Sequence, residues 1–205
     1  GLVGEDSMQE CLRRWLLDEN EFWLQAGFPA TAQSDPTFRA HPEWKDVRMN
    51  CPWNGRSWPM VNSHLVDALA NAARVWGGPW YGHASDGLQK ALRMLFHEDD
   101  PSRPCCYEHF NPITGTPALY RGYDDYMHSW VVDLILRHVV GVRFPGEARV
   151  NGAKDIEGGW QLDPVPVEGH WSCEGVPVGP GRRLDVRKVS GRIWSDLRLA
   201  PRLNS

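Results

Sequence analysis

Apolar residues recur at the spacing of an α-helix in four separate segments of the chain, and each recurrence predicts a helix with one buried face. These segments are 5–27, 58–76, 86–96 and 124–138. The second opens with a proline at the favoured first helical position and closes before two glycines and another proline, which stop a helix. The pattern therefore predicts helices in series, joined by loops.

Two of the connecting segments are long and irregular, 30–56 and 99–122. Loops of this length inside a compact domain are usually functional. After the fourth helix the helical periodicity is lost, glycine and proline become frequent, and short β-type runs such as 184–189 appear. We therefore predict a mainly α domain over residues 1–143 and a small all-β appendage over residues 144–205.

Composition and charge narrow the choice of partners. The 205 residues are 41% hydrophobic and carry a formal net charge of −4, so no cationic field is expected to gather nucleic acid or anionic lipid. No apolar run approaches the ~20 residues of a membrane helix. The five cysteines have irregular spacing and give no support to a metal site or a disulfide framework. We expect no nucleic-acid partner, no membrane partner, no metal and no cofactor, and the sequence does not indicate a compartment.

Tryptophan is unusually frequent, with 11 Trp against 6 Phe and 5 Tyr. A flat indole can stack on the C–H face of a pyranose while its N–H serves a hydroxyl. Two of these residues, Trp53 and Trp58, flank Asn54, Gly55 and Arg56 just before the second helix. Glycine would let the backbone approach a ligand, and arginine offers a planar fork of donors. The alternative is that both indoles are packing residues and that Arg56 pairs with a surface acid.

A carboxylate lies among aromatic residues in the second long loop. Glu108 stands between Tyr107 and His109, shortly before an Asn-Pro turn. Such neighbours exclude water and suit a carboxylate for general-base work, although a lone glutamate is more often a solvated surface group. His109 and His128 could hydrogen-bond sugar hydroxyls, or they could serve packing alone.

Three motifs resemble those of (α/α)6-toroid glycoside hydrolases grouped with family 63, which includes processing α-glucosidase, mannosylglycerate hydrolase and glucosylglycerate hydrolase. Residues 107–115, Tyr-Glu-His-Phe-Asn-Pro-Ile-Thr-Gly, resemble the E-x-(Y/F)-(N/D)-P-x-T-G signature. Residues 53–59, Trp-Asn-Gly-Arg-Ser-Trp-Pro, resemble the W-x-G-x-x-W-P element, and residues 120–130 resemble the segment that leads into the last barrel helix. The three occur in the family's order within residues 5–143.

The resemblance implies a fold and roles for particular residues. It implies the C-terminal part of an (α/α)6 toroid, a six-hairpin glycosidase, followed by a small all-β appendage. It makes Glu108 the residue that activates water. It assigns sugar binding to the motif residues and their neighbours, which are Trp53, Asn54, Gly55, Arg56, Trp58, Tyr107, His109, Arg121 and His128.

One element of the resembled family has no match. Its enzymes take a general acid, an aspartate, from the first half of the barrel, and an inverting glycosidase needs two carboxyls ~6.5–9.5 Å apart. Asp124, Asp125 and Asp133 are better explained by helix capping and surface exposure. Because the chain also begins directly in a helical pattern, we expect a C-terminal portion that associates with the N-terminal part of the same enzyme or with another subunit.

The expected function is that of an enzyme, an inverting, exo-acting O-glycosidase on a glucosyl- or mannosyl-type sugar, with this chain carrying the general-base half of the site. Two alternatives remain open. The chain could be a catalytically incomplete carbohydrate-binding or scaffold fragment, as the unmatched acid suggests. It could also be a toroid-fold polysaccharide lyase, because Tyr120, Arg121 and His128 are residues of the types that such an enzyme uses.

Overall fold

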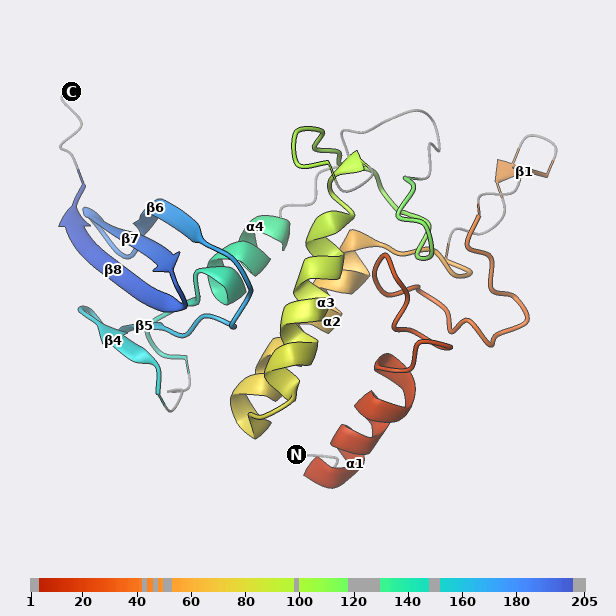
Figure 1. Ribbon diagram of the computed structural model, residues 1–205, viewed down its shortest axis with the longest axis horizontal. Helices are drawn as coiled ribbons and strands as arrows, with labels where there is room; N and C mark the ends of the chain where they lie inside the picture. Colours follow the sequence, from red (N-terminus) through yellow and green to blue (C-terminus); the bar gives the residue numbers. More distant parts are fainter. Residues whose placement is uncertain are drawn as a thin grey trace. The chain divides into compact units, whose positions relative to one another are not determined.

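The computed structural model describes residues 4–41, 44–45, 48–49, 53–97, 100–117, 130–147 and 152–200. The chain divides into two compact units, Gly1–Val131 and Val132–Ser205 (Figure 1). The division falls within the last helical segment, so most of that helix belongs with the strands that follow it.

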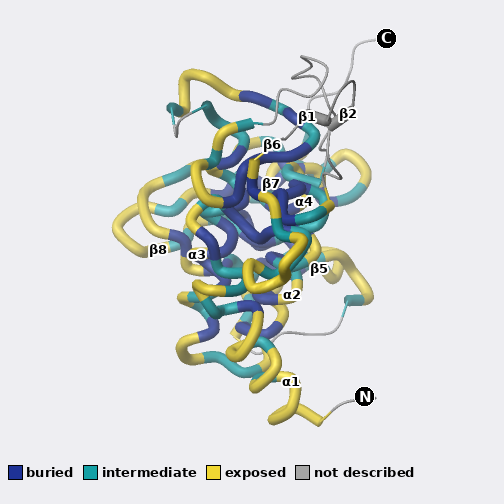
Figure 2. The backbone as a smooth tube through the Cα atoms, turned by 90° about the vertical axis from the view of Figure 1, so that its right-hand side faces the viewer, coloured by how far each residue is buried: buried dark blue, intermediate teal, exposed yellow. Residues whose placement is uncertain are grey.

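The N-terminal helix is shorter than its apolar pattern predicts. Helix α1 (Glu5–Cys11) continues as a π-helical segment, η1 (Leu12–Leu16), and ends there instead of reaching Gly27. An aspartate turn stops it: the Asp18 carboxylate accepts the Asn20 N–H at 2.8 Å. Such local side-chain bonds offer the backbone an alternative to the helix. No residue of α1 is buried, and Figure 2 shows this helix as largely exposed.

The expected second and third helices form a hairpin. Helix α2 (Pro59–Trp76) and helix α3 (Trp80–Arg93) pack side by side (Figure 1). Gly77, with a φ of +66°, makes the turn between them possible because a side chain is rarely tolerated there. Gly87 permits close packing: a Cβ at this position would lie 3.0 Å from Cδ1 of Leu69. The hairpin is the main helical element of the first unit.

The second unit is built mainly from strands. It begins within helix α4 (Trp130–Leu134) and continues through a π-helical segment, η4 (Ile135–Val139). One antiparallel sheet has the order β3-β5-β4, and another is the meander β6-β7-β8. The strands are β3 (Val142–Arg143), β4 (Lys154–Ile156), β5 (Trp160–Leu162), β6 (Trp171–Pro177), β7 (Arg182–Val189) and β8 (Arg192–Leu199).

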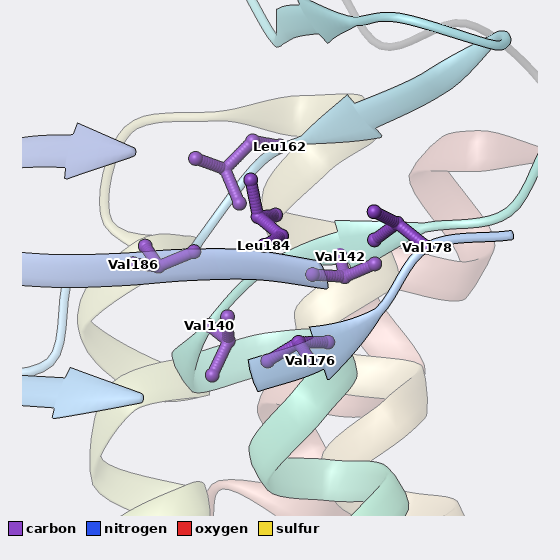
Figure 3. Close-up of a cluster of buried hydrophobic side chains, with 7 residues drawn as sticks. All are labelled: Val140, Val142, Leu162, Val176, Val178, Leu184 and Val186. Atoms are coloured by element: carbon purple, nitrogen blue, oxygen red, sulfur yellow. The ribbon is translucent and has the colours of Figure 1, made fainter. Parts of the chain in front are cut away.

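A single apolar cluster holds the second unit together. Its buried members come from the residue after η4, from both sheets and from the segment after β6, and their side chains converge in Figure 3. They are Val140, Val142, Leu162, Val176, Val178, Leu184 and Val186. Burying aliphatic side chains of this size contributes about 1.5–3 kcal/mol each, so the cluster is a large favourable contribution to the folding free energy of this unit.

The mainly α expectation, with the chain as part of an (α/α)6 toroid, is wrong. Of the described helices only α2 and α3 are longer than seven residues, and the described residues also contain eight strands, including the short pair β1 (Trp44–Lys45) and β2 (Arg48–Met49). Two physical reasons explain the difference. Turn-forming bonds at Asp18 end the first helix early, and the residues after α4 alternate between inward and outward positions, which favours strands. Among the described helices, none combines the length and the apolar character that crossing a lipid bilayer requires.

Candidate active site

The two motif loops of the first unit are joined through their backbones. Ser57 and Phe110 exchange hydrogen bonds, with the Ser57 N–H donating at 2.9 Å and the Phe110 N–H at 2.8 Å. Pro29 pairs with Ser57 on one side, and Pro117 pairs with Phe110 on the other. Segments that are about fifty positions apart in the sequence therefore lie next to one another, and the residues flanking Ser57 become neighbours of those flanking Phe110.

A buried amide supports this junction from the first turn of α2. Asn62 has no exposed surface, and its Oδ1 accepts the Phe28 N–H at 2.8 Å. Its Nδ2 donates to the Phe28 carbonyl at 3.0 Å and to Oγ of Ser57 at 2.9 Å. Gly27 makes room for the amide, because a Cβ there would lie 2.7 Å from Asn62 Oδ1. Asn62 was not predicted as a site residue from the sequence, although a polar residue on the apolar face of a helix is a signal for such a role.

The two tryptophans of the first motif stack on one another. The rings of Trp53 and Trp58 are parallel within 3°, and their centroids are 3.9 Å apart. Trp58 is 6% exposed and Trp53 is 43% exposed, so the outer indole keeps a free surface while the inner one is covered. The ring of His109 lies 4.9 Å from that of Trp58. The structure therefore brings together one aromatic pair from the first motif and one imidazole from the second.

His109 is an unusual interior group. It is fully buried, and neither ring nitrogen has a hydrogen-bond partner in the described part of the chain. Burial lowers the pKa of His109 to about 4, and the nearby positive charge of Arg56 adds to the effect. The imidazole is therefore neutral near pH 7, and its position beside Trp58 is compatible with packing or with hydrogen bonding to a group not present here.

Arg56 is also fully buried. Its Nη2 donates to the backbone carbonyl of His41, and its own carbonyl accepts the Ala30 N–H at 2.9 Å. The hydroxyl of Thr31 donates to the Trp53 carbonyl at 2.8 Å. The long loop after residue 27 is thus bound along the first motif, and Arg56 is part of the interior that holds it.

Gly55 and Asn54 serve the same loop. Gly55 has a φ of +111°, and a Cβ there would lie 2.6 Å from the Phe38 ring. The carbonyl of Asn54 accepts the Arg39 N–H. The close backbone approach that glycine permits is therefore an approach to the protein's own loop, while contact of either residue with a sugar stays a prediction.

The Asn-Pro turn of the second motif is closed by its own side chain. Oδ1 of Asn111 accepts the N–H groups of Ile113 at 2.9 Å and Thr114 at 3.2 Å. This fixes the amide orientation, so Nδ2 donates to Nδ1 of His41 at 3.1 Å. His41 therefore links both motifs, through its carbonyl to Arg56 and through its ring to Asn111. His41 was not predicted from the sequence, because it lies outside both motifs.

Glu108 is half-buried between two buried residues. Its neighbour Tyr107 packs edge-on against Phe110, with centroids 6.3 Å apart, and against His97 at 5.6 Å. Within the described part of the chain, no hydrogen bond or ion pair engages the Glu108 carboxylate. A partly exposed and uncommitted carboxylate can accept a proton from water or bind a hydroxyl.

Other candidates lie elsewhere. Arg121, His128, Tyr120, Asp124 and Asp125 fall outside the described residues. Asp133 is exposed on α4. Within the described ranges, no group of three or more histidine, cysteine or acidic side chains could hold a metal ion.

Two hollows adjoin the turn that follows Asn111. One, of about 280 Å³, is lined in part by Arg93, Thr114 and Gly115. The other, more open and of about 440 Å³, is bordered by Trp23, Lys90 and Ile113. Lys90 donates to the Leu24 carbonyl at 2.8 Å and lies 5.4 Å from the Trp23 ring, and partial burial is the main cause that lowers its pKa. Glu108 lines neither hollow, and neither was foreseen from the sequence.

One comparison with known proteins gives a match. A family model described as the mannosylglycerate hydrolase MGH1-like glycoside hydrolase domain matches residues 2–129. The match spans more than half of the chain and includes both motif loops. No curated protein sequence and no solved structure matches the chain.

Proposed function

Because the chain belongs to the mannosylglycerate hydrolase MGH1-like glycoside hydrolase family, we propose that it carries the general-base half of an inverting, exo-acting O-glycosidase. The family supports glycoside hydrolysis in general. One observation carries the finer assignment. Glu108, whose carboxylate makes no hydrogen bond or ion pair with the described residues, directly precedes His109, and the His109 ring lies 4.9 Å from that of Trp58 in the other motif.

In this proposal Glu108 activates water. Its carboxylate accepts a proton as the water oxygen attacks the anomeric carbon, and the bond to the leaving oxygen breaks while a general acid on the opposite face protonates that oxygen. The product then has the opposite anomeric configuration. A half-buried carboxylate that forms no ion pair with any described residue suits the role, because its oxygens remain available to water.

The indole pair forms a wall of the sugar subsite. The exposed face of Trp53 can stack on the C–H face of a glucosyl or mannosyl ring, and Trp58 fixes the orientation of that indole from below. Arg56 and His109, which are fully buried, support the wall from the interior. Their part is to hold the two loops in place, and Asn54 and Tyr107 complete the loops on either side.

We propose that the general acid comes from a polypeptide segment outside this chain, either the N-terminal part of the same enzyme or another subunit. A general acid needs a raised pKa. In the first unit, Asp35 and Asp100 have lowered pKa values because each carboxylate accepts hydrogen bonds, from Thr37 and Ser102 respectively. Glu21 accepts a bond from Ser34 at 2.7 Å. These acids serve local structure.

The base assignment is tested in the complete enzyme with aryl glycosides and with glucosyl and mannosyl disaccharides. Glu108→Gln keeps the side-chain size and removes the base, so kcat is expected to fall by roughly 10²–10⁴ with little change in KM. Trp53→Ala is expected to act mainly on KM, because it removes a wall of the subsite. Glu10→Gln, the same chemical change on the exposed helix α1, is the matched control. Turnover like that of the wild type in Glu108→Gln would refute the assignment.

The chain on its own is expected to bind sugar without releasing product. This is also what the binding-fragment alternative describes, so the two are separated by adding the missing segment. Size-exclusion chromatography with light scattering would reveal association, and the same glycosides would report activity. A stable monomer that hydrolyses a glycoside unaided would show that the acid lies within this chain. A product that absorbs in the ultraviolet would instead indicate a lyase.

A further inference from the structure

The sheet β6-β7-β8 has two unlike faces. Along β7, Leu184 and Val186 point into the cluster of Figure 3, so Asp185 and Arg187 lie on the opposite face. The strand register places Arg187 directly opposite Trp194 of β8. This second face carries mainly polar side chains, and its exposed apolar residues are Trp194 and, at the end of β7, Val189.

We propose that this outward face binds one pyranose unit of a neutral carbohydrate. A hollow of about 310 Å³ lies here. Its outward-facing side chains are Ser172, Glu174, Asp185, Arg187, Trp194 and Asp196. The face lies in the second unit, outside residues 2–129, so the inference does not depend on Glu108 or on the reaction proposed for it.

Trp194 supplies the platform. It is 52% exposed, whereas Trp160 and Trp171 of the same unit pack against the apolar cluster. A single exposed apolar residue needs no explanation by itself. Here the Trp194 indole borders a hollow, and the exposed guanidinium of Arg187 lies opposite it on the neighbouring strand. The indole offers a surface on which a sugar ring can stack, and the guanidinium offers planar donors to the sugar hydroxyls.

The polar partners are of two kinds. Asp185 is held in one orientation, because it accepts the Gly175 N–H at 2.6 Å and an Arg198 N–H at 2.6 Å. The bond from Arg198 is the main cause that lowers the pKa of Asp185, so this carboxylate is a fixed acceptor. The guanidinium of Arg187, in contrast, makes no hydrogen bond or ion pair with the described residues. A fixed acceptor beside an uncommitted donor matches paired sugar hydroxyls.

The charges around the hollow and its volume limit the kinds of ligand that it can bind. The carboxylates of Glu174, Asp185 and Asp196 outnumber the guanidinium groups of Arg187 and Arg198 around the hollow, which disfavours an anionic glycan. The volume is at the lower end of the ~300–1,000 Å³ typical of small-molecule sites. A single neutral sugar residue at the end or along the side of a glycan fits both constraints.

The test uses the full chain labelled with 5-fluorotryptophan, whose fluorine resonances report each indole separately. The chain carries Trp53→Ala, so that the indole pair of the first unit cannot contribute. Methyl α-glucoside, methyl α-mannoside and maltose are titrated into it, and the Trp194 resonance is identified by its absence in Trp194→Phe. We expect a saturable shift of the Trp194 resonance with at least one of these sugars, independent of salt because the ligand is neutral.

Two variants and one control decide the outcome. Trp194→Ala is expected to weaken the affinity about tenfold or more, and Arg187→Gln to weaken it severalfold. Both side chains face outward, so neither change should unfold the sheet. Trp15→Ala removes another indole of similar exposure, at 45%, and should leave the affinity unchanged. The proposal is overturned if no neutral sugar shifts the resonance, if Trp194→Ala binds as before, or if only glucuronate or spermidine binds, with salt dependence. Loss of activity in Glu108→Gln has no bearing on these readouts.

Discussion

The interiors of the two units are built from different kinds of side chain. In the first unit the fully buried residues include Arg56, Asn62 and His109, together with Phe28 and Phe110. In the second unit the buried cluster is made of valines and leucines alone (Figure 3). Burying a polar group costs free energy unless it is hydrogen-bonded, whereas aliphatic packing carries no such condition. The first unit therefore holds its motif loops at a cost in stability that the aliphatic cluster of the second unit does not bear, although the second unit also buries two polar residues, His138 and Gln161.

The position of the polar interior explains why that cost is tolerated. Asn62 and Arg56 bind backbone groups of the loops that carry the two motifs, and His109 lies directly under the indole pair. Backbone groups in irregular loops cannot satisfy one another as they do in a helix, so side chains must bind them. The second unit needs few such contacts because its strands pair in regular ladders.

The largest expected effect lies in the second unit. Gly141 has a φ of +80°, and a Cβ there would lie 2.1 Å from the backbone nitrogen of Pro164. The added methyl group of Gly141→Ala forces this segment away from the backbone at Pro164, at the edge of the apolar cluster. We therefore expect a loss of about 3–5 kcal/mol in the unfolding free energy. Urea denaturation followed by amide resonances of β6 to β8 measures it.

Gly146→Ala is the matched control. Gly146 has a φ of +90° but no atom within 4 Å of an added Cβ, so only the backbone strain of about 1–2 kcal/mol remains. Equal losses of unfolding free energy in Gly141→Ala and Gly146→Ala would show that close packing at Gly141 does not contribute to stability.

In the first unit the expected effect is smaller and depends on polar groups. Asn62→Leu keeps the approximate volume but leaves both backbone groups of Phe28 without their partner. We expect a loss of about 2–4 kcal/mol, seen as a lower urea midpoint by tryptophan fluorescence. Ser63→Ala, which removes only a bond within the same helix, is the control and should cost less than about 1 kcal/mol. If Asn62→Leu left the unfolding free energy unchanged, the hydrogen bonds of Asn62 would not be what holds the loops.

The smallest effect is a pH dependence confined to the first unit. The pKa of His109 is about 4 in the folded chain and near 6.5 in an unfolded one, so the unfolded state binds more protons between these values. Stability should therefore fall as the pH drops from about 6.5 to 5, by about 1–2 kcal/mol from this group. His109→Phe should remove that part of the slope, measured as thermal unfolding at several pH values. An unchanged slope would show that another group is responsible.

Several local features could be read from the sequence. Helix α2 begins at the proline and ends before the two glycines as predicted, because these signals act on their own backbone. Helix α3 begins at Trp80, earlier than predicted, because the turn at Gly77 and Gly78 leaves no loop between the helices. The first helix was predicted too long, since its apolar spacing continues past Asp18 while the turn chemistry there does not allow a helix.

The sequence by itself determined the motifs, the hairpin and the family, all of which depend on residues close together in the chain. Only the tertiary structure decided that Ser57 pairs with Phe110, that Asn62 and His41 hold the loops, and that Arg56 and His109 are buried. The physical reason is that periodicity and turn signals describe how a segment folds on its own backbone. Pairing between distant loops is decided by the burial and the hydrogen bonds that their side chains gain together.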